Sequence, residues 1–459
     1  MRSFLRRGIA SFLLCTGLSS LGQAADRPNI LFAIADDWSF GHAGVYGCDW
    51  VRTPNFDRLA KEGILFQRAY TPNAKCAPSR AIILTGRNSW QLENAGNHMT
   101  IFPPKFGGWV ELLESNGYTT GYTGKGWGPG YARDANGKAR KITGTAWQKQ
   151  KDKPPARAIS NNNYAGNFAD FLKAASETEG KPWAFWFGTT EPHRGYEYGV
   201  GRRMGKKLSD IDRVPKYWPD NEVIRNDMLD YSIEVEHYDN HLGKIVATLE
   251  AAGVTQIAPI MQPITGRSLF DIFRSPKSGR VIPSRDHVLI GKERHDIGRP
   301  KNWGYPIRGI VKGDWLYLHN FKTNRWPSGH PTTGYLNCDG SPTKTTILNQ
   351  RRNGTNHFWN LNFGKRPKEE LFYLIGDADC VKNLAESKSQ LGIKKSLREQ
   401  LFAELGKQGD PRMFGKGDVF DNYPYSGVAT DNFYERYTSG EKVRAGWVNP
   451  ADFEKEKLD

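Results

Sequence analysis

The sequence predicts an α/β protein in two parts, a doubly wound, mainly parallel sheet followed by a smaller α+β domain. In the first part, continuous apolar runs typical of buried parallel strands, such as 28–35 and 183–188, alternate with helical patterns. In the second part the content shifts to shorter strand-like segments. A chain of 459 residues is long enough for more than one core. We therefore place the larger domain at 26–264 and the smaller one at 265–459.

Residues 1–25 have the features of a secretory signal peptide. Three arginines precede a short apolar run, and small residues follow it where a signal peptidase would cut. The alternative, a membrane anchor, is disfavoured because the run is short and is interrupted by glycine and serine. We therefore expect a secreted or periplasmic protein with no membrane span in its mature part.

The formal net charge of +15 indicates an anionic partner. Nucleic acid, an anionic surface and a sulfated polysaccharide are all compatible with that charge. The chain has no basic run and no known nucleic-acid motif, which disfavours nucleic acid as the partner. Its five cysteines are too few for a disulfide scaffold.

The first predicted strand, 28–35, ends in the acidic pair Asp36 and Asp37. Acids in this position lie at the carboxyl edge of a parallel sheet, where α/β proteins carry their sites. The pattern then predicts these elements in order: a helix beginning at Phe56, a strand over 63–66, a helix over 109–116, a strand over 118–122, a helix over 165–178, a strand over 183–188 and a long helix over 226–252. In the second part it predicts strands over 281–290, 307–311 and 314–318 and a helix over 394–405.

The segment over 76–87, Cys-Ala-Pro-Ser-Arg-Ala-Ile-Ile-Leu-Thr-Gly-Arg, carries the clearest chemical signal. A cysteine at a helix start lies in the positive end of the helix dipole, which lowers the thiol pKa and suits an anionic ligand. A lone cysteine there is more often a buried structural residue. The whole string, however, resembles the signature of type I sulfatases. That resemblance implies that a formylglycine-generating enzyme converts Cys76 to formylglycine, whose hydrated form attacks sulfur while Arg80 steadies it.

The resemblance to sulfatases continues in chain order. Asp36 and Asp37 match the paired aspartates that hold a divalent cation, usually Ca²⁺, together with the modified Cys76. An acidic pair alone is equally compatible with a helix cap. Lys125 matches a lysine that contacts the sulfate, and His193 matches a histidine that reaches the sulfate and the leaving-group oxygen.

Trp127 departs from this resemblance. Many members of the family have a histidine two residues after the lysine, where it assists the release of sulfate. Because this chain has a tryptophan there, the sequence assigns that role to no residue.

The second part of the chain contributes weaker matches. Segments 293–296 and 304–308 resemble segments of heparan N-sulfatase (N-sulfoglucosamine sulfohydrolase) relatives that form the substrate rim. The resemblance implies substrate contacts for Arg294, His295 and Arg308. It also implies an alkaline-phosphatase-like fold and hydrolysis of sulfate esters or sulfamates on a sulfated glycan such as heparan sulfate. The alternative is a catalytically impaired, sulfatase-like glycan-binding protein.

A central segment that the resemblance implies is missing near residues 254–264. Relatives complete the metal site with an Asp-Asn or Asp-His pair at the end of a further apolar strand. Here about a dozen residues follow the helix ending at Gly253, too few for a strand-helix-strand crossover. We interpret Asp239-Asn240-His241 as a solvated helix face and not as a substitute. The sequence therefore predicts weak metal binding, low turnover and exposed apolar neighbours of the missing strand.

Overall fold

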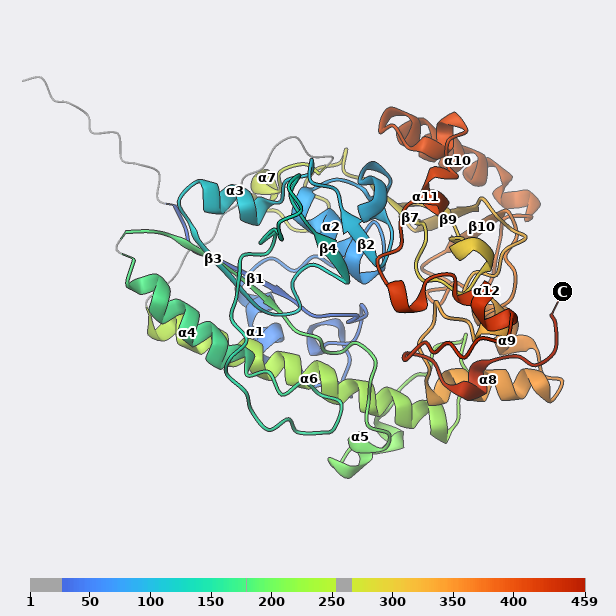
Figure 1. Cartoon of the computed structure of the whole chain (residues 1–459), viewed down its shortest axis with the longest axis horizontal. Coiled ribbons are helices and arrows are strands. Elements are labelled where there is room, and N and C mark those ends of the chain that lie inside the picture. Colours follow the sequence, from blue (N-terminus) through green and yellow to red (C-terminus); the bar gives the residue numbers. More distant parts are fainter. Residues whose placement is uncertain (1–26, 179, 253–265, 459) are drawn as a thin grey trace, which may run out of the picture.

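The computed structural model describes residues 27–178, 180–252 and 266–458. A parallel sheet organises the N-terminal half of this part of the chain and an antiparallel sheet the C-terminal half (Figure 1). The predicted signal peptide over 1–25 lies outside the described residues, as do residues 253–265, where the central segment is expected to be missing. Within the described residues, no helix is both long and apolar enough to cross a membrane.

The first sheet has four parallel strands in the order β1, β6, β3, β5. Their bounds are β1 Ile30–Ile34, β6 Trp183–Gly188, β3 Thr119–Gly124 and β5 Thr145–Ala146. All six residues of β6 are buried, as expected for a central strand covered on both faces.

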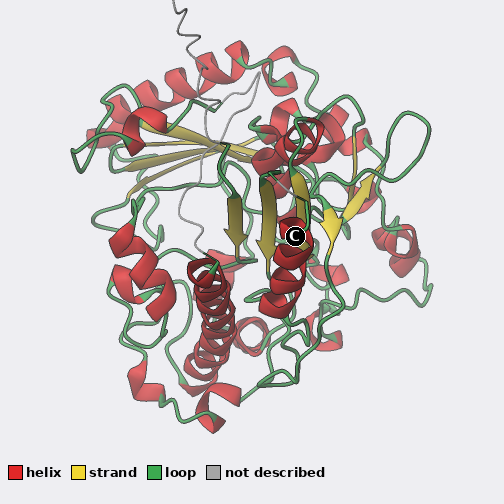
Figure 2. Ribbon diagram, turned by 90° about the vertical axis from the view of Figure 1, so that its left-hand side faces the viewer, coloured by secondary structure: helices red, strands yellow, loops and turns green. Residues whose placement is uncertain are grey.

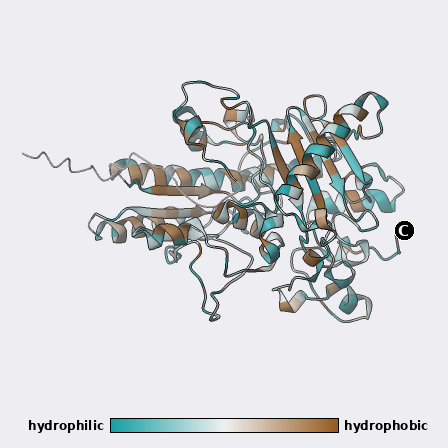
Figure 3. Cartoon of the chain, turned by 90° about the horizontal axis from the view of Figure 1, so that it is seen from above, coloured by the Kyte–Doolittle hydropathy of each residue, from teal (hydrophilic) through white to brown (hydrophobic). Residues whose placement is uncertain are grey.

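Helices cover both faces of this sheet, and the side chains of β6 show how. Phe185 and Phe187 pack against the core of α4 and α6, whereas Trp186 packs against α2 and α3. Successive residues of a strand point to opposite faces, so this alternation places one helix layer on each side (Figure 3). The doubly wound fold expected from the sequence is therefore confirmed. The helices are α1 Pro54–Glu62, α2 Cys76–Thr85, α3 Trp109–Ser115, α4 Tyr164–Ser176, α5 Val200–Arg203 and α6 Glu222–Ala251.

The second sheet is antiparallel, in the order β10, β9, β8, β7, and its strands run in a different direction from those of the first (Figure 2). Helix α10, Leu391–Lys407, lies on it and buries three leucines against Ile310 and Leu371. The strands are β7 His287–Lys292, β8 Ile307–Lys312, β9 Trp315–Asn320 and β10 Glu369–Tyr373. The other elements of the described chain are the β2–β4 pair, Thr100–Phe102 and Gly130–Ala132, short 3₁₀ turns, and the helices α7 Phe270–Phe273, α8 Pro342–Arg352, α9 His357–Asn362, α11 Val419–Asn422 and α12 Phe433–Thr438.

One edge of the parallel sheet differs from the rest. β1 pairs with β6, and no strand in the described residues pairs with its other side. All five residues of β1 are only half-buried, although the sequence is apolar throughout. An edge strand leaves backbone N–H and C=O groups unpaired and one flank uncovered. This exposure agrees with the expectation that a missing strand leaves its apolar neighbours open.

The strand predicted over 63–66 is wrong, because this segment is irregular. Ile64 and Phe66 are 49% and 39% exposed. An apolar segment becomes a strand only where a neighbour takes its backbone hydrogen bonds, and none of the described strands pairs with this one. The other predicted elements are present with shifted ends; the strand predicted over 281–290, for example, begins at His287.

Candidate active site

Three loops leave the parallel sheet at the same edge. Gly188 of β6 is in register with Ile34 of β1 and with Gly124 of β3. The carboxyl ends of these strands therefore coincide, and the polar residues just beyond them are brought together. Those residues are Asp36, Lys125 and His193.

Asp36 is buried at this edge and is neutralised by two cations. Its Oδ1 lies 3.1 Å from a guanidinium nitrogen of Arg80, and its Oδ2 accepts a hydrogen bond from Lys125 Nζ. Burial raises the pKa of the Asp36 carboxyl, but Lys125 and Arg80 outweigh burial and hold the pKa below its usual value. Asp36 is therefore ionised throughout the neutral pH range.

Arg80 also fixes the loop that follows β3. Its guanidinium donates hydrogen bonds of 2.7 Å to the carbonyl oxygens of Lys125 and Gly126. Arg80 lies four residues after Cys76 in α2, so the two share one face of the helix. A single buried arginine thereby holds both Asp36 and Lys125 beside residue 76.

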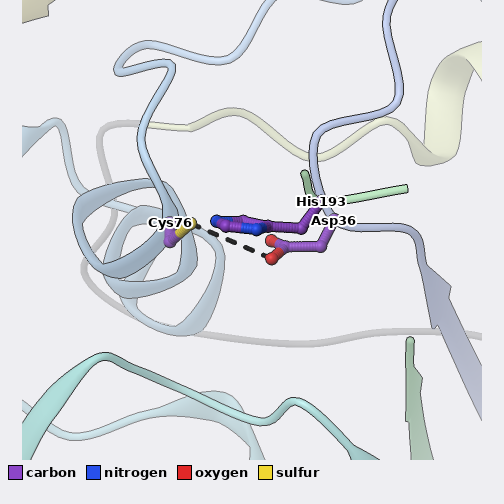
Figure 4. Close-up of side chains that lie close together, drawn as sticks. All are labelled: Asp36, Cys76 and His193. Carbon is purple, nitrogen blue, oxygen red and sulfur yellow. Dashed lines mark hydrogen bonds between the residues drawn. The ribbon is translucent and has the colours of Figure 1, made fainter. Parts of the chain in front are cut away.

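Cys76 is the first residue of α2, and its side chain meets Asp36 and His193 (Figure 4). Its Sγ lies 3.9 Å from Asp36 Oδ2. Burial raises the pKa of the Cys76 thiol, but hydrogen bonds to His193 and His98 outweigh it, and the pKa falls to about 6. The unmodified thiol is therefore mostly a thiolate at neutral pH.

His193 faces Cys76 from the loop after β6. Its hydrogen bond to Cys76 raises the pKa of the imidazole to about 9; burial opposes this shift, and Asp37 adds to it. Nδ1 lies 3.0 Å from the carbonyl oxygen of Arg194, and because a carbonyl only accepts, we assign a proton to Nδ1. Nε2 lies 3.8 Å from Asp37 Oδ2. The arrangement makes His193 a proton donor beside residue 76.

The carboxylates of Asp36 and Asp37 suit a hard divalent cation. Asp36, Cys76 and His193 offer ligand atoms within 4.8 Å of one another, and the Asp37 side chain is 48% exposed. Calcium takes six to eight oxygens. Among the described residues, this cluster offers two carboxylates beside residue 76, and both oxygens of Asp36 already contact cations. The donor set fits only one side of a calcium site.

Asp239 does not supply the other side. Its carboxylate accepts hydrogen bonds from the backbone N–H groups of Asn55 and Phe56, at 3.1 and 2.7 Å, at the start of α1. Asp239 and His241 are 2% and 3% exposed. The prediction of a solvated helix face is therefore wrong for these two residues, because α1 and α4 pack against α6 and cover them.

The three residues predicted to contact substrate lie deep in the structure. Arg308 is fully buried and pairs with two acids of the C-terminal half, at 2.6 and 2.7 Å. Arg294 donates to the backbone carbonyls of residues 423 and 424. His295 is buried beside His98. The hydrogen bonds of both arginines thus stabilise the interior of the C-terminal half. No described interaction joins either arginine to Cys76.

The sequence interpretation missed His98, which does join the cluster. Its Nδ1 lies 3.0 Å from Asp296 Oδ1. Burial lowers the pKa of the His98 imidazole, but the charge of Asp296 and hydrogen bonding with Asp296 and Cys76 outweigh burial and raise it. Asp296 comes 198 residues later in the chain. No local motif marks either residue, because a lone histidine and a distant aspartate meet only through the tertiary fold.

Comparison with known sequences gives consistent matches. A family model described as sulfatase matches residues 28–256. N-acetylgalactosamine-6-O-sulfatase of Bacteroides thetaiotaomicron is 39% identical over 123 residues, which cover 25% of this chain and 24% of that protein. Human iduronate 2-sulfatase is 38% identical over 142 residues, which cover 28% of this chain and 24% of that protein. The aligned stretches thus span about a quarter of the relatives' length.

Solved structures share the fold. A putative sulfatase from Bacteroides fragilis has a TM-score of 0.58 at 15% identity, covering 86% of this chain and 99% of that one. A protein in complex with its substrate D-glucosamine-2-N,6-O-disulfate has a TM-score of 0.55 at 15% identity, covering 84% and 99%. The phosphonate monoester hydrolase of Agrobacterium radiobacter has a TM-score of 0.52 at 14% identity, covering 83% and 96%. These likenesses show the fold alone, and it is the alkaline-phosphatase-like fold expected from the sequence.

Proposed function

The chain belongs to the sulfatase family, and from this premise we propose that it hydrolyses sulfate esters or sulfamates of a sulfated glycan. The observation that carries the proposal is the convergence of three cationic side chains, Arg80, Lys125 and His193, on the buried side chain of residue 76 and its neighbour Asp36. Cations held in place before the reaction stabilise an anionic reacting group. The net charge of +15 supports a polyanionic substrate.

The proposal includes conversion of Cys76 to formylglycine by a formylglycine-generating enzyme. Once formed, this group supplies a hydrated aldehyde whose oxygen attacks sulfur. The surroundings of Cys76 fit such a side chain, because two histidines from separate loops, His193 and His98, both lower the pKa of the Cys76 thiol. Two hydroxyl groups would give each histidine its own partner.

Three residues of the chain have the remaining roles in the proposed reaction. Lys125, whose side chain is 21% exposed, binds a sulfate oxygen. Arg80 holds Asp36 and the loop of Lys125 in place. His193 faces residue 76 from the β6 loop and gives a proton to the leaving-group oxygen or nitrogen.

A divalent cation, Ca²⁺, belongs to the proposal at Asp36, Asp37 and the oxygen of residue 76. It would supply further positive charge to the sulfate. Because Arg80 and Lys125 already neutralise Asp36, and because the described residues fill one side of the site, we expect the cation to bind weakly. A glycan substrate and the predicted signal peptide both favour a secreted or periplasmic location.

The test is sulfate release by protein matured with a formylglycine-generating enzyme and supplied with Ca²⁺. Suitable substrates are D-glucosamine-2-N,6-O-disulfate and N-acetylgalactosamine 6-sulfate, because the similar proteins bind or are named for such groups. Heparan sulfate is included because the sequence resembles heparan N-sulfatase relatives. Cys76→Ala is the control. Release above this control from any substrate supports the proposal. Release no greater than the control from all of them would overturn it.

A further inference from the structure

A cavity outside the active site lies between the loop that precedes α2 and the segment that leads into β7. Its volume is about 690 Å³, within the usual range of ligand sites. Residues from 65–70 form one wall and residues from 278–288 another, and the turn between β8 and β9 completes the lining. The described residues that line this cavity include none of those assigned to catalysis.

The two acids in the lining are already neutralised. Asp286 Oδ2 lies 3.1 Å from Lys312 Nζ, and Asp286 Oδ1 lies 2.7 Å from His287 Nδ1. Asp314 Oδ1 lies 2.7 Å from a guanidinium nitrogen of Arg68. The negative charge of the lining is thus committed to these pairs, and Arg68 is committed to Asp314.

Two further arginines of the lining have no acidic partner. Within the described residues, the Arg280 side chain makes no ion pair or hydrogen bond. The Arg285 guanidinium donates to the backbone carbonyl of Ser268, and no described carboxylate pairs with it. An arginine that meets no carboxylate can bind a sulfate group of a ligand through paired N–H bonds. The lining therefore favours an anionic ligand.

Two exposed aromatic rings line the same cavity. Phe66 and Tyr70 are 39% and 40% exposed. The apolar lining residues beside them are Leu65, Ile272, Val281 and Ile282. Apolar surface that stays open to solvent indicates a binding surface, and aromatic faces pack well against the C–H faces of sugar rings. The cavity thus combines apolar contacts for sugar rings with arginines for sulfate groups.

A short segment of chain connects this cavity to the active site. Tyr70 precedes Cys76 by only six residues, which limits the distance between their Cα atoms to about 20 Å. Between them, the Pro72 carbonyl accepts a hydrogen bond of 2.7 Å from the N–H of Gly291 in β7. A long glycan bound in the cavity would therefore be kept close to residue 76, which raises its effective concentration there.

We propose that this cavity is a second binding site for the sulfated glycan, which holds a long chain near residue 76 while one of its sulfate groups reacts. Arg280 and Arg285 bind sulfate groups of the chain, and Phe66 and Tyr70 pack against its sugar rings. The inference rests on the proposed function, because the class of ligand is the substrate proposed there. It predicts a preference for long chains, because a monosaccharide cannot occupy both sites at once.

Binding is tested without turnover, on Cys76→Ala protein with a heparan sulfate dodecasaccharide as the probe. In isothermal titration calorimetry, adding Arg280→Gln and Arg285→Gln together should weaken binding about 10-fold or more. Phe66→Ala should weaken it about threefold. The matched control adds Lys388→Gln and Lys395→Gln, which remove the same charge from exposed positions at the start of α10, and should change the affinity less than about twofold.

Equal losses in the two double variants would overturn the proposal, because net charge alone would then explain binding. A DNA oligonucleotide of the same charge that binds as tightly as the dodecasaccharide would also overturn it, because the site would then not recognise sugars. Hydrogen–deuterium exchange of the Cys76→Ala protein should show protection of 65–70 and 278–288 when the dodecasaccharide is added. No protection in either segment would overturn the proposal without any variant of the cavity.

Steady-state kinetics of matured protein test the consequence for turnover. The double variant Arg280→Gln/Arg285→Gln should raise KM for the dodecasaccharide about 10-fold while kcat stays within about twofold of wild type. KM for the monosaccharide D-glucosamine-2-N,6-O-disulfate should not change. An unchanged KM for the dodecasaccharide, or an equal rise for both substrates, would overturn the proposal. No sulfate release even from wild type would overturn the proposed function, and the binding measurements on Cys76→Ala protein would then show separately whether the cavity binds the glycan.

Discussion

The two sides of β1 differ in almost every respect. On the side of β6, the sheet is closed, the neighbouring strand is fully buried, and the loops carry Asp36, Lys125 and His193 to one place. On the other side, no described strand pairs with β1. All five residues of β1 are half-buried. The residues assigned to sulfate and to the leaving group depend on the closed side. The metal ligands expected from family resemblance depend on the open one. Within the described residues, Asp36, Lys125 and His193 thus lie on the paired side of β1, and the other side has no described strand.

Replacement of Arg80 should produce the largest effect, because Arg80 organises the closed side. Arg80→Gln removes the buried charge that pairs with Asp36 at 3.1 Å and weakens the bonds to the β3 loop. We expect kcat/KM to fall about 10³-fold and the free energy of unfolding to fall by about 3 kcal/mol. Sulfate release and urea unfolding measure the two losses. Arg68→Gln, at an exposed arginine, is the control, and an active Arg80→Gln protein would mean that the closed side is not the functional half.

Truncation of an apolar side chain in β6 should lower the free energy of unfolding more than truncation of one in β1. Phe187→Ala opens a cavity beside Tyr238 and Tyr164 in the core and should cost about 3–5 kcal/mol. Leu31→Ala, in half-buried β1, should cost only about 1 kcal/mol, because much of that side chain already meets water. Both values come from urea unfolding of the unmatured protein. Equal losses would show that β1 is covered in solution.

Calcium binding tests whether the open side of β1 lacks metal ligands. With Asp36 and Asp37 as the carboxylate ligands, we expect a dissociation constant of about 10⁻⁴–10⁻³ M. Ca²⁺ at ten times that concentration should stabilise the protein by about 1.4 kcal/mol, seen as a higher Tm. Asp37→Asn should abolish the shift, because it removes the more exposed carboxylate. Submicromolar binding by isothermal titration calorimetry would contradict an incomplete site.

The smallest expected effect is a loss of stability in acid. Although burial raises it, the pKa of Asp36 is held below its usual value by Lys125 and Arg80, so it is lower in the folded than in the unfolded state. Its contribution is therefore complete above the usual aspartate pKa and is lost as the pH falls below that value. Wild type should lose more free energy of unfolding than Asp36→Asn between pH 5 and pH 3. Parallel pH profiles would show that the Asp36 pairs add no stability.

The sequence predicts the fold and the closed side well, because both follow from local patterns. Apolar runs identify β1 and β6, and polar residues placed just after parallel strands gather at one edge. The structure accordingly brings Asp36, Lys125 and His193 to Cys76. Each of these residues lies in a recognisable motif or directly after a predicted strand.

Features that depend on distant partners could not be predicted in this way. The pairing of His98 with Asp296 joins two halves of the chain. The burial of Asp239 depends on where α1 packs, and the exposure of Phe66 depends on the absence of a described strand beside it. Periodicity reports which side of an element is apolar and not what covers it.

The most direct test of the account is to measure sulfate release and formylglycine content in the same preparations. Formylglycine at residue 76 is quantified by mass spectrometry of the peptide that contains it, across batches matured to different extents. Sulfate release should rise in proportion to the converted fraction and fall to background in Cys76→Ala. A fully converted protein that releases no more sulfate than Cys76→Ala, with Ca²⁺ present, would contradict it.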